Sequence, residues 1–526
     1  MQLRPVIASA GLLAGALVAL SGTTAQAAST RYEAETAPAT CTGTIDSDRA
    51  GYSGSGFCNG TNAVGASAQF TVKAPAAGTA TLKVRFANGT TTARPADVIV
   101  NGSTATNATF AGTGTWNTWT TQTLTVPVKA GSNTVRFSPT TSGGLPNIDY
   151  LDVDVSGDST TPPASGALYV APNGSDGAAG TQSNPTTLAS AISRVAPGGT
   201  IYLRGGTYNY SSTITIPQGQ DGTSSARTTL SAYPGETPVL NFSAQSESSS
   251  NRGIQLFASY WHLYGLTVEH AGDNGIYVGG SNNVIERAVT AYNHDTGLQL
   301  GRIASSTPSS QWPSNNLVLS SESHDNEDSG GENADGFAAK LTTGTGNVFR
   351  YDVSHNNIDD GWDLYTKSDT GAIGPVTIEY SLSYDNGTLT DGTQNTSGDR
   401  NGYKLGGEKI AVNHVVQHNI AFHNGHDGFT YNSNPGDMTV TDNVGIDNAE
   451  RNFHWESGNS VFRNDTSCRF GVSGTNDKVV GNTDSSDQFW TGSNGSRCSS
   501  YSGALAWSYA SDGHLVVTFG GKQVTP

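Results

Sequence analysis

The feature that most constrains the fold is an eleven-residue cassette that occurs six times between residues 283 and 448 and always ends in asparagine. Each cassette alternates apolar and polar positions, as expected for a short strand, a bend and a second short strand. Asparagine accepts left-handed backbone angles, and asparagines stacked at one level can bond one another through their amides. Unrelated turn asparagines would not share one frame six times, so the repeat predicts a right-handed parallel β-helix rather than a sandwich or propeller. The cassettes are NVIERAVTAYN (283–293), NLVLSSESHDN (316–326), NVFRYDVSHNN (347–357), VTIEYSLSYDN (376–386), HVVQHNIAFHN (414–424) and MTVTDNVGIDN (438–448).

After each asparagine the chain reaches another short strand that usually opens with glycine and an apolar residue. Examples are GFAAK (336–340), GWDLY (361–365) and GYKLG (402–406). In two coils a long insert, 327–335 or 387–401, separates the asparagine from this strand. Long loops on one edge of a solenoid commonly build its binding groove.

Alignment of these strands brings five polar residues into one patch. Asp335 and Asp360 each precede the opening glycine, and Asp363 and Lys404 each follow it by two residues. Asp359 adds a further carboxylate at the turn. Adjacent parallel strands lie ~4.8 Å apart, so the repeat predicts Asp363 and Lys404 side by side in neighbouring coils.

Four carboxylates at this spacing repel one another, and no arginine occupies the same strand positions. A hard divalent cation with oxygen ligands resolves the repulsion, and calcium tolerates flexible, water-completed coordination. We therefore predict a calcium site at Asp335, Asp359, Asp360 and Asp363. The alternative is that Asp359 and Asp360 are ordinary turn residues, which would not explain the aligned set. A bound calcium would favour the neutral amine of Lys404, which is then a competent general base.

The rest of the chain predicts an exported protein of two domains. Residues 1–28 read as a secretory signal peptide, so the protein is expected to be secreted and extracellular. Residues 29–155 alternate in short runs typical of a β-sandwich, and 156–166 form a Pro-containing linker. Residues 167–526 hold the β-helix, so the fold class is all-β.

Smaller features complete this organisation. A short amphipathic helix at 187–195 is expected to cap the first coil, and the chain after about residue 470 to close the last one. Four cysteines in an exported chain indicate disulfides, which we pair locally as Cys41–Cys58 and Cys468–Cys498. The net charge of −17 makes nucleic acid an improbable partner, and no segment after the signal is long enough to span a membrane. We expect a monomer.

Three segments carry a family resemblance: ENADGFAAK (332–340), HNNIDDGWDLY (355–365) and NGYKLGG (401–407) closely resemble polysaccharide lyase family 9, which contains pectate lyases. The resemblance covers most of residues 167–470. It implies that the four aspartates bind calcium and that Lys404 is the Brønsted base.

The upstream domain resembles carbohydrate-binding modules of family 35 in RYEAE (31–35), GYSGSGF (51–57) and NIDYLDVDV (147–155). This resemblance implies sugar binding. It makes Glu33, Glu35 and Asp152 candidate ligands of a structural calcium. It also makes Tyr52, Trp116 and Asn147 candidate sugar contacts, although these side chains could equally belong to the core.

Together these observations predict a calcium-dependent pectate lyase that cleaves polygalacturonate-type pectic chains by β-elimination and leaves 4,5-unsaturated uronate ends. Three alternatives stay open. The first is a rhamnogalacturonan lyase of the same family. The second is a β-helical glycoside hydrolase, which would use paired carboxylates around a water molecule. The third is a wall-binding protein without catalysis.

Overall fold

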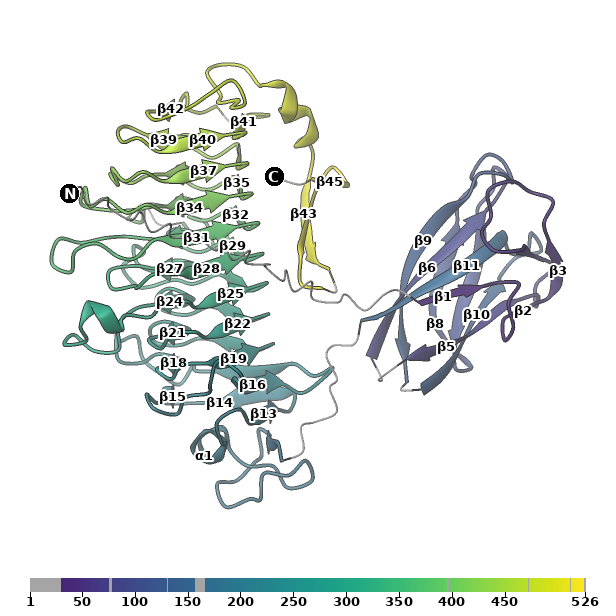
Figure 1. Ribbon diagram of the computed structural model, residues 1–526, viewed down its shortest axis with the longest axis horizontal. Helices are drawn as coiled ribbons and strands as arrows, with labels where there is room; N and C mark the ends of the chain where they lie inside the picture. Colours follow the sequence, from purple (N-terminus) through teal and green to yellow (C-terminus); the bar gives the residue numbers. More distant parts are fainter. Residues whose placement is uncertain are drawn as a thin grey trace, which may run out of the picture. The chain divides into compact units, whose positions relative to one another are not determined.

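The computed structural model describes residues 30–74, 78–129, 131–156, 166–394, 397–471, 473–510 and 512–524. The predicted signal peptide and residues 157–165 of the predicted linker lie outside the described residues. The chain divides into two compact units, Met1–Gly157 and Asp158–Pro526. The first is a β-sandwich and the second a stack of short strands (Figure 1).

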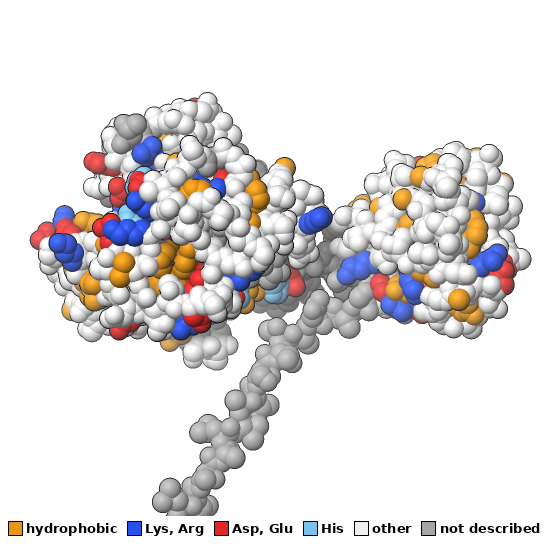
Figure 2. Space-filling model, turned by 90° about the horizontal axis from the view of Figure 1, so that it is seen from above, with side chains coloured by type: hydrophobic (Ala, Val, Ile, Leu, Met, Phe, Trp, Pro, Cys, Tyr) orange, Lys and Arg blue, Asp and Glu red, His pale blue; other side chains and the backbone are white. Residues whose placement is uncertain are grey.

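Charged side chains are sparse in this protein. Charged residues make up 13% of the chain, and on the face seen in Figure 2 acidic and basic side chains occur among many uncharged ones. Within the described ranges, no helix is both long enough and apolar enough to cross a membrane.

The first unit consists of two antiparallel sheets that face each other across an apolar core. Alternate side chains point inward, among them Phe70, Val84, Phe110 and Phe137, and the disulfide Cys41–Cys58 joins the two sheets. This confirms the predicted β-sandwich and the first disulfide. One sheet contains β1 (Thr30–Glu33), β3 (Gly43–Asp46), β4 (Phe57–Gly60), β6 (Gly78–Ala87), β9 (Thr120–Val128) and β11 (Asn147–Ser156); the other contains β2 (Thr40–Cys41), β5 (Ala68–Ala74), β7 (Arg94–Val100), β8 (Ser103–Phe110) and β10 (Gly131–Pro139).

The second unit is a parallel β-helix, since each coil contributes one strand to each of three parallel sheets. Sheet one contains β12 (Leu168–Val170), β13 (Thr200–Leu203), β16 (Thr228–Ala232), β19 (Trp261–Tyr264), β22 (Val284–Glu286), β25 (Leu317–Leu319), β28 (Asn347–Arg350), β31 (Val376–Glu379), β34 (Val415–Gln417), β37 (Thr439–Thr441) and β40 (Val461–Arg463). Sheet two contains β14 (Gly206–Asn209), β17 (Pro238–Asn241), β20 (Thr267–Glu269), β23 (Val289–Ala291), β26 (Glu322–His324), β29 (Val353–His355), β32 (Leu382–Tyr384), β35 (Ile420–Phe422), β38 (Val444–Ile446) and β41 (Thr466–Cys468). Sheet three contains β15 (Ile214–Ile216), β18 (Ile254–Leu256), β21 (Ile276–Val278), β24 (Leu298–Leu300), β27 (Phe337–Ala339), β30 (Trp362–Asp363), β33 (Tyr403–Lys404), β36 (Phe429–Thr430), β39 (Phe453–Trp455) and β42 (Lys478–Val479).

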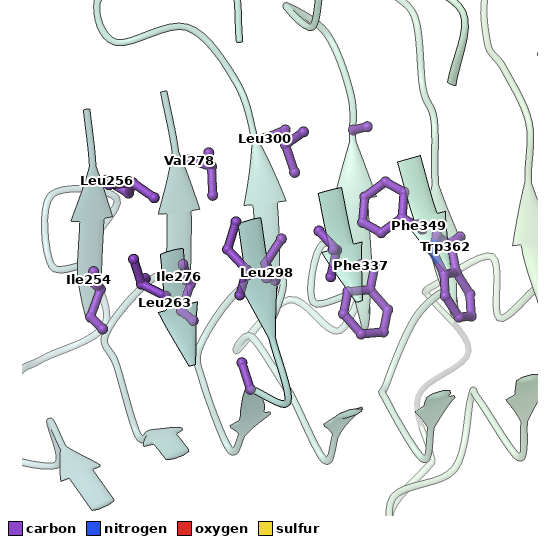
Figure 3. Close-up of a cluster of buried hydrophobic side chains, with 14 of the residues drawn as sticks. Ile254, Leu256, Leu263, Ile276, Val278, Leu298, Leu300, Phe337, Phe349 and Trp362 are labelled. Carbon is purple, nitrogen blue, oxygen red and sulfur yellow. The ribbon is translucent and has the colours of Figure 1, made fainter. Parts of the chain in front are cut away.

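Equivalent side chains of successive coils stack on one another inside the helix. One row of sheet three runs from Ile254 through Ile276 and Leu298 to Phe337 and Trp362 (Figure 3). The row continues as stacked rings, with Trp362, Tyr403, Phe429 and Phe453 separated by 4.7–4.9 Å. All of these side chains are buried, and burial of each apolar one contributes about 1.5–3 kcal/mol.

The six cassette asparagines form the predicted ladder. From Asn293 to Asn448, each side-chain amide donates to the next asparagine at 2.7–2.9 Å, and the last amide reaches Asn452. The expectation of left-handed angles at these asparagines is wrong, however. In every coil the left-handed residue is the one before the ladder asparagine, for example Tyr292 with a φ of 58°.

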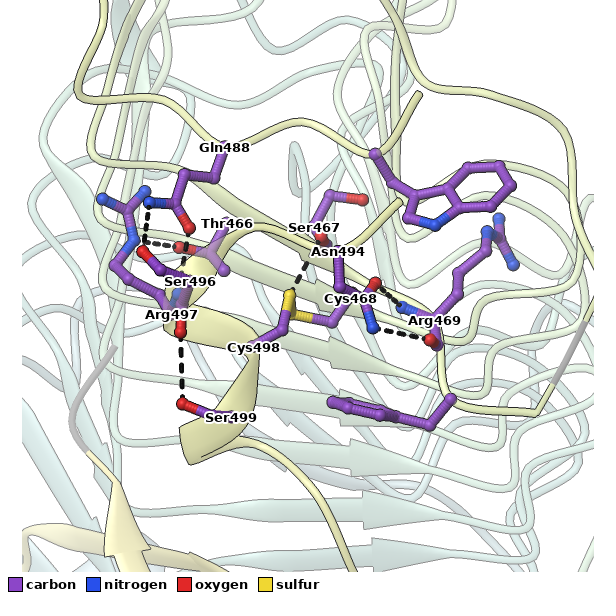
Figure 4. Close-up of a disulfide and its surroundings, with 12 residues drawn as sticks. Thr466, Ser467, Cys468, Arg469, Gln488, Asn494, Ser496, Arg497, Cys498 and Ser499 are labelled. Carbon is purple, nitrogen blue, oxygen red and sulfur yellow. Dashed lines mark hydrogen bonds between the residues drawn. A yellow bond between two sulfur atoms is a disulfide. The ribbon is translucent and has the colours of Figure 1, made fainter. Parts of the chain in front are cut away.

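Both ends of the helix are covered. In α1 (Leu188–Arg194), which Thr187 caps by accepting from Ser190 N, the side chains of Leu188, Ala191 and Ile192 are buried against the first coil. This confirms the predicted cap. At the other end the chain from 473 to 500, which includes η2 (Ser496–Ser500), pairs with the last coil, and the disulfide Cys468–Cys498 fastens it (Figure 4). The second disulfide prediction is thereby confirmed.

The remaining chain does not close the end, contrary to expectation. β43 (Leu505–Tyr509), β44 (Leu515–Phe519) and β45 (Lys522–Val524) form an antiparallel sheet that packs against the side of sheet two. Trp507 Nε1 donates to Tyr384 Oη at 3.0 Å, and Tyr509 Oη donates to Ser321 O at 2.8 Å. A further short helix, η1 (Ser309–Gln311), lies in the loop before β25.

Candidate functional site

The predicted patch lies where the two inserts meet sheet three. Asp335 and Asp360 occupy equivalent places directly before β27 and β30, and Gly336 N donates to Asp360 O at 3.0 Å. In the register of the sheet, Ala338 lies opposite Asp363, and Asp363 lies opposite Lys404. The neighbouring positions predicted for these residues are therefore observed.

Asp335, Asp359, Asp360 and Asp363 form what we call the carboxylate cluster. Asp335, Asp359 and Asp360 each offer an oxygen atom, and these oxygens lie within 4.8 Å of one another. All four side chains are buried. Asp360 Oδ1 accepts from Asn401 N at 2.7 Å and from Asn401 Nδ2 at 2.9 Å, whereas Asp360 Oδ2 is buried without a hydrogen-bond donor. Apart from the Lys404 ammonium beside it, this oxygen is left for a ligand.

Lys404 lies against this open oxygen. Its Nζ is 3.1 Å from Asp360 Oδ2, 3.9 Å from Asp363 Oδ2 and 2.8 Å from Asp399 Oδ2. The ring centroid of Tyr365 is 5.4 Å from the same nitrogen. Asp399 comes from the insert 387–401, and its main-chain nitrogen donates to Asp359 Oδ1 at 2.5 Å. The insert therefore contributes both a charge and a hydrogen bond to the site.

A second lysine, Lys340, was missed by the sequence analysis. Its Nζ is 2.6 Å from Asp335 Oδ2 and 3.3 Å from Asp363 Oδ2, and only 12% of its side chain is exposed. The argument that nothing offsets the aspartates is therefore incomplete. Four carboxylates and two ammonium groups leave a formal charge of −2, and Asp399 beside Lys404 adds a further negative charge, so the site keeps an excess of negative charge that a divalent cation would offset.

Burial governs the electrostatics of the site. It raises the pKa of Asp335 to about 6 and that of Asp360 to about 7, and it raises the pKa of Asp359 well above its ordinary value. Burial alone would lower the pKa of Lys404, but Asp360 and Asp363 outweigh it and raise the pKa strongly. A lysine in this setting stays protonated unless further positive charge arrives.

The donor set fits calcium. It consists of carboxylate oxygens on two neighbouring coils, one of those oxygens accepts no hydrogen bond, and the cluster has an excess of negative charge. Calcium binds such oxygen ligands in flexible geometry. A calcium ion would also supply the positive charge that favours a neutral Lys404.

In the β-sandwich, one of the three predicted calcium ligands does not lie beside the other two. Asp152 pairs with Arg31, with Arg31 Nε 2.7 Å from Asp152 Oδ1, and lies apart from Glu33 and Glu35. Asp149 lies nearer to Glu33, because Ser53 donates its main-chain N–H to Asp149 at 3.0 Å and its hydroxyl to Glu33 at 2.7 Å, but Asp149 is itself paired with Arg85 at 3.0 Å. The strand has an irregular register between Ile148 and Tyr150, which turns Asp149 inward.

The candidate sugar contacts of the sandwich differ in accessibility. Trp116 is half-buried with the Arg94 guanidinium 5.1 Å from its ring centroid, and Tyr52 packs on Phe57 with ring centroids 5.6 Å apart. Asn147 is buried. Trp116 and Tyr52, which are both half-buried, are therefore better placed to meet a ligand than Asn147.

Comparisons with known proteins agree with this geometry. The sequence model described as "Pel9A-like, right handed beta helix region" matches residues 168–466, and that of carbohydrate-binding module family 6 matches residues 33–155. The handedness of the β-helix and the resemblance of the second unit to Pel9A-like lyases are thus confirmed, and the sandwich matches a carbohydrate-binding module, of family 6.

Individual relatives point in the same direction. Pectate lyase L of Paenibacillus polymyxa (strain SC2) is 51% identical over 359 residues, which are 67% of this chain and 79% of the relative. The crystal structure of pectate lyase Pel9A is 30% identical with a TM-score of 0.56, and the match covers 68% of this chain and 88% of that one. A rhamnogalacturonan lyase, 23% identical with a TM-score of 0.51 over 60% of this chain and 85% of its own, shares the fold.

Proposed function

The chain belongs to the family of Pel9A-like right-handed β-helix proteins and is a polysaccharide lyase, and from this premise we propose that it is a secreted, calcium-dependent pectate lyase. The substrate class we propose is a polygalacturonate-type chain. The observation that carries the proposal is the position of Lys404, whose amine lies 3.1 Å from a buried Asp360 oxygen that has no hydrogen-bond donor.

Asp335, Asp359, Asp360 and Asp363 would hold the calcium ion. When bound, calcium supplies positive charge that stabilises a uronate carboxylate while the neighbouring C5 proton is removed. The carboxylate cluster itself keeps the site negative enough to attract this ion, and Lys340 neutralises part of that charge at Asp335 and Asp363.

Lys404 has the role of proton acceptor. Its neutral amine takes the C5 proton, the C5–H electron pair forms the C4=C5 double bond, and the C4–O bond breaks with its electrons on the leaving oxygen. Water supplies the proton that this oxygen then takes. Asp360 and Asp399, which contact Lys404 Nζ, orient the amine. A chain end with a 4,5-unsaturated uronate results.

A hydrolytic mechanism suits this site less well. Glycosidases of the retaining kind place their two carboxyl groups about 5–5.5 Å apart, and inverting ones place them farther apart. Here the ligand oxygens of Asp335, Asp359 and Asp360 lie within 4.8 Å of one another, and a lysine stands where an attacking water would be activated. This arrangement favours metal binding over acid–base catalysis by paired carboxylates.

The remaining features support a protein that works outside the cell. Two disulfides fit an oxidising compartment, and the β-sandwich belongs to a class of modules that bind carbohydrate. We propose that the module keeps the lyase close to its polymer and raises the effective substrate concentration without taking part in the chemistry.

Two substitutions separate the roles of the ion and the base. Asp360→Asn keeps an oxygen but loses a charge, so calcium should bind more weakly and excess calcium should restore part of the rate. Lys404→Ala leaves every proposed ligand in place, so calcium should still bind while turnover falls by a factor on the order of 10²–10⁴. Excess calcium should not rescue this variant.

The measurement is lyase rate on polygalacturonate across a calcium titration, with calcium affinity determined by calorimetry. Lys522→Ala, at an exposed position of β45, is the control and should match the wild type. Near wild-type turnover of Lys404→Ala would show that another group is the base.

A further inference from the structure

A cavity of about 440 Å³ lies on the same side of the coils as the carboxylate cluster but outside it. Its walls come from the corners between sheets two and three and from the insert 387–401. Asp325 fastens the insert to these corners, since it accepts from Thr390 N at 2.7 Å and from Thr390 Oγ1 at 2.8 Å. The lining residues are His270, Tyr292, His294, Asp325, Glu327, Leu389, Thr390 and Asp391. We call this cavity the Tyr292 pocket.

Tyr292 has an unusual backbone for its residue type. Its φ is 58°, in the left-handed region that asparagine and aspartate tolerate better than an aromatic residue does. The equivalent positions in the other coils are held by polar residues, His270, Asp325, Asn356, Asp385, His423 and Asp447. Backbone strain of this kind tends to cluster at ligand sites.

The ring of Tyr292 is fixed and open at the same time. It stacks on His270 with ring centroids 5.2 Å apart and an interplanar angle of 15°, and it meets His324 nearly at right angles with ring centroids 5.7 Å apart. Even so, 45% of the residue is exposed, which makes it one of the few large hydrophobic residues so accessible in the described chain. A rigid, exposed aromatic face can pack against the apolar face of a sugar ring.

The charged side chains that line the pocket favour neutral sugars over acidic ones. Three carboxylates line it, from Asp325, Glu327 and Asp391, and none of the described lining residues is lysine or arginine. Carboxylates accept hydrogen bonds from sugar hydroxyl groups. They repel a uronate, whose carboxylate would meet negative charge on several sides. The lining therefore suits a neutral sugar and opposes a charged one.

The Tyr292 pocket shares a wall residue with a second cavity, which contains neighbours of the carboxylate cluster. His294 also lines a second cavity of about 490 Å³, whose walls include Asp295 and Asn333. Thr296, the next residue along the chain, donates its hydroxyl to Asp335 Oδ2 at 2.9 Å. A chain that occupies the carboxylate cluster could thus extend a neutral unit or branch toward Tyr292.

We propose that the Tyr292 pocket binds a neutral pyranose unit next to, or branching from, the polygalacturonate-type stretch that the carboxylate cluster takes, so that chains with such units bind more tightly than uniform ones. This inference rests on the proposed lyase function. It predicts that Tyr292 contributes to binding of chains that carry neutral sugars and contributes nothing to chains that lack them.

The test compares two ligands on full-length Lys404→Ala protein, in which turnover is expected to be too slow to consume the ligands during a titration. The ligands are a rhamnogalacturonan oligosaccharide, which alternates neutral and acidic sugars, and an oligogalacturonate of equal length. Tyr292→Asn, added to this parent, should weaken binding of the first by about five- to tenfold, the usual worth of an aromatic contact, and leave the second unchanged in calorimetric titrations. The β-sandwich is the same in both proteins and contributes a constant background.

Two controls separate binding from folding. Tyr292→Asn places a residue that tolerates left-handed angles at a left-handed position, so its unfolding temperature should equal or exceed that of the parent. Tyr380→Asn makes the same change at a tyrosine with a φ of 54° that stacks on His418 at another corner, and it should bind both ligands like the parent.

Equal affinity of Tyr292→Asn and its parent for the mixed chain would overturn the proposal, as would an equal loss for both ligands. Failure of the lyase function is a separate result, because it would appear as wild-type protein that forms no unsaturated product from either polymer.

Discussion

Replacement of Lys340 by methionine tests whether a cation belongs in the carboxylate cluster. The change removes one of two ammonium groups and keeps the length of the side chain. Asp335 is completely buried and loses a partner at 2.6 Å, and Asp363 loses one at 3.3 Å. Breaking a buried ion pair from one side costs about 3–5 kcal/mol, and the partial exposure of Lys340 places the expected cost near the lower end, at about 3 kcal/mol. In a unit of this size that corresponds to an unfolding temperature lower by about 3–6 °C.

Calcium should reverse much of this loss. Without Lys340 the cluster carries a larger excess of negative charge, so the ion relieves more repulsion in the variant than in the wild type. Calorimetric scans with a chelator and with calcium should therefore give a larger calcium-induced rise in the unfolding temperature for Lys340→Met. Lys340→Arg keeps the charge and should resemble the wild type. The reasoning would be refuted if calcium raised the unfolding temperature of Lys340→Met by the same amount as that of the wild type, or by less.

Two further predictions concern other parts of the chain. Burial lowers the pKa of His414, whose Nδ1 accepts from Val376 N at 3.1 Å, to about 3. In the unfolded chain the His414 imidazole binds a proton near pH 6.5, whereas in the folded protein it stays neutral until the pH approaches 3. The free energy of unfolding therefore decreases as the pH falls from 6.5 toward 3, by about 3 kcal/mol at pH 4.5. Unfolding scans at pH 7 and pH 4.5 should show a smaller difference in stability for His414→Asn than for the wild type. An unchanged difference would show that other groups cause the acid sensitivity. Deletion of residues 29–160 should lower activity on plant cell walls and spare activity on soluble polygalacturonate, as measured by product release; equal loss on both would rule out a tethering role.

The repeat explains why much of the site could be predicted. A parallel β-helix places residues of the same frame on neighbouring strands, so the glycine-anchored alignment sufficed to put Asp363 opposite Lys404. Strand pairing between successive coils preserves that frame across the inserts. The asparagine ladder was predictable for the same reason, although the left-handed angle falls on the residue before each asparagine.

The site residues that the sequence did not predict were missed for physical reasons as well. Lys340 lies beyond β27, and its reach back to Asp335 depends on a long flexible side chain rather than on strand register. Asp399 belongs to an insert without a repeat frame, so nothing in the sequence pattern indicated that it contacts Lys404. The exchange of Asp152 for Asp149 follows from a strand irregularity, which alternation of period two does not anticipate.

The central claim is that this chain cleaves pectic polymers by calcium-dependent β-elimination, and the most direct test is ultraviolet absorbance during incubation with polygalacturonate. An unsaturated uronate absorbs there, whereas the product of hydrolysis does not. The account predicts that absorbance rises with calcium present, stops when a chelator is added and resumes when calcium is restored. New reducing ends without any rise in absorbance, or a rise that the chelator leaves untouched, would contradict it.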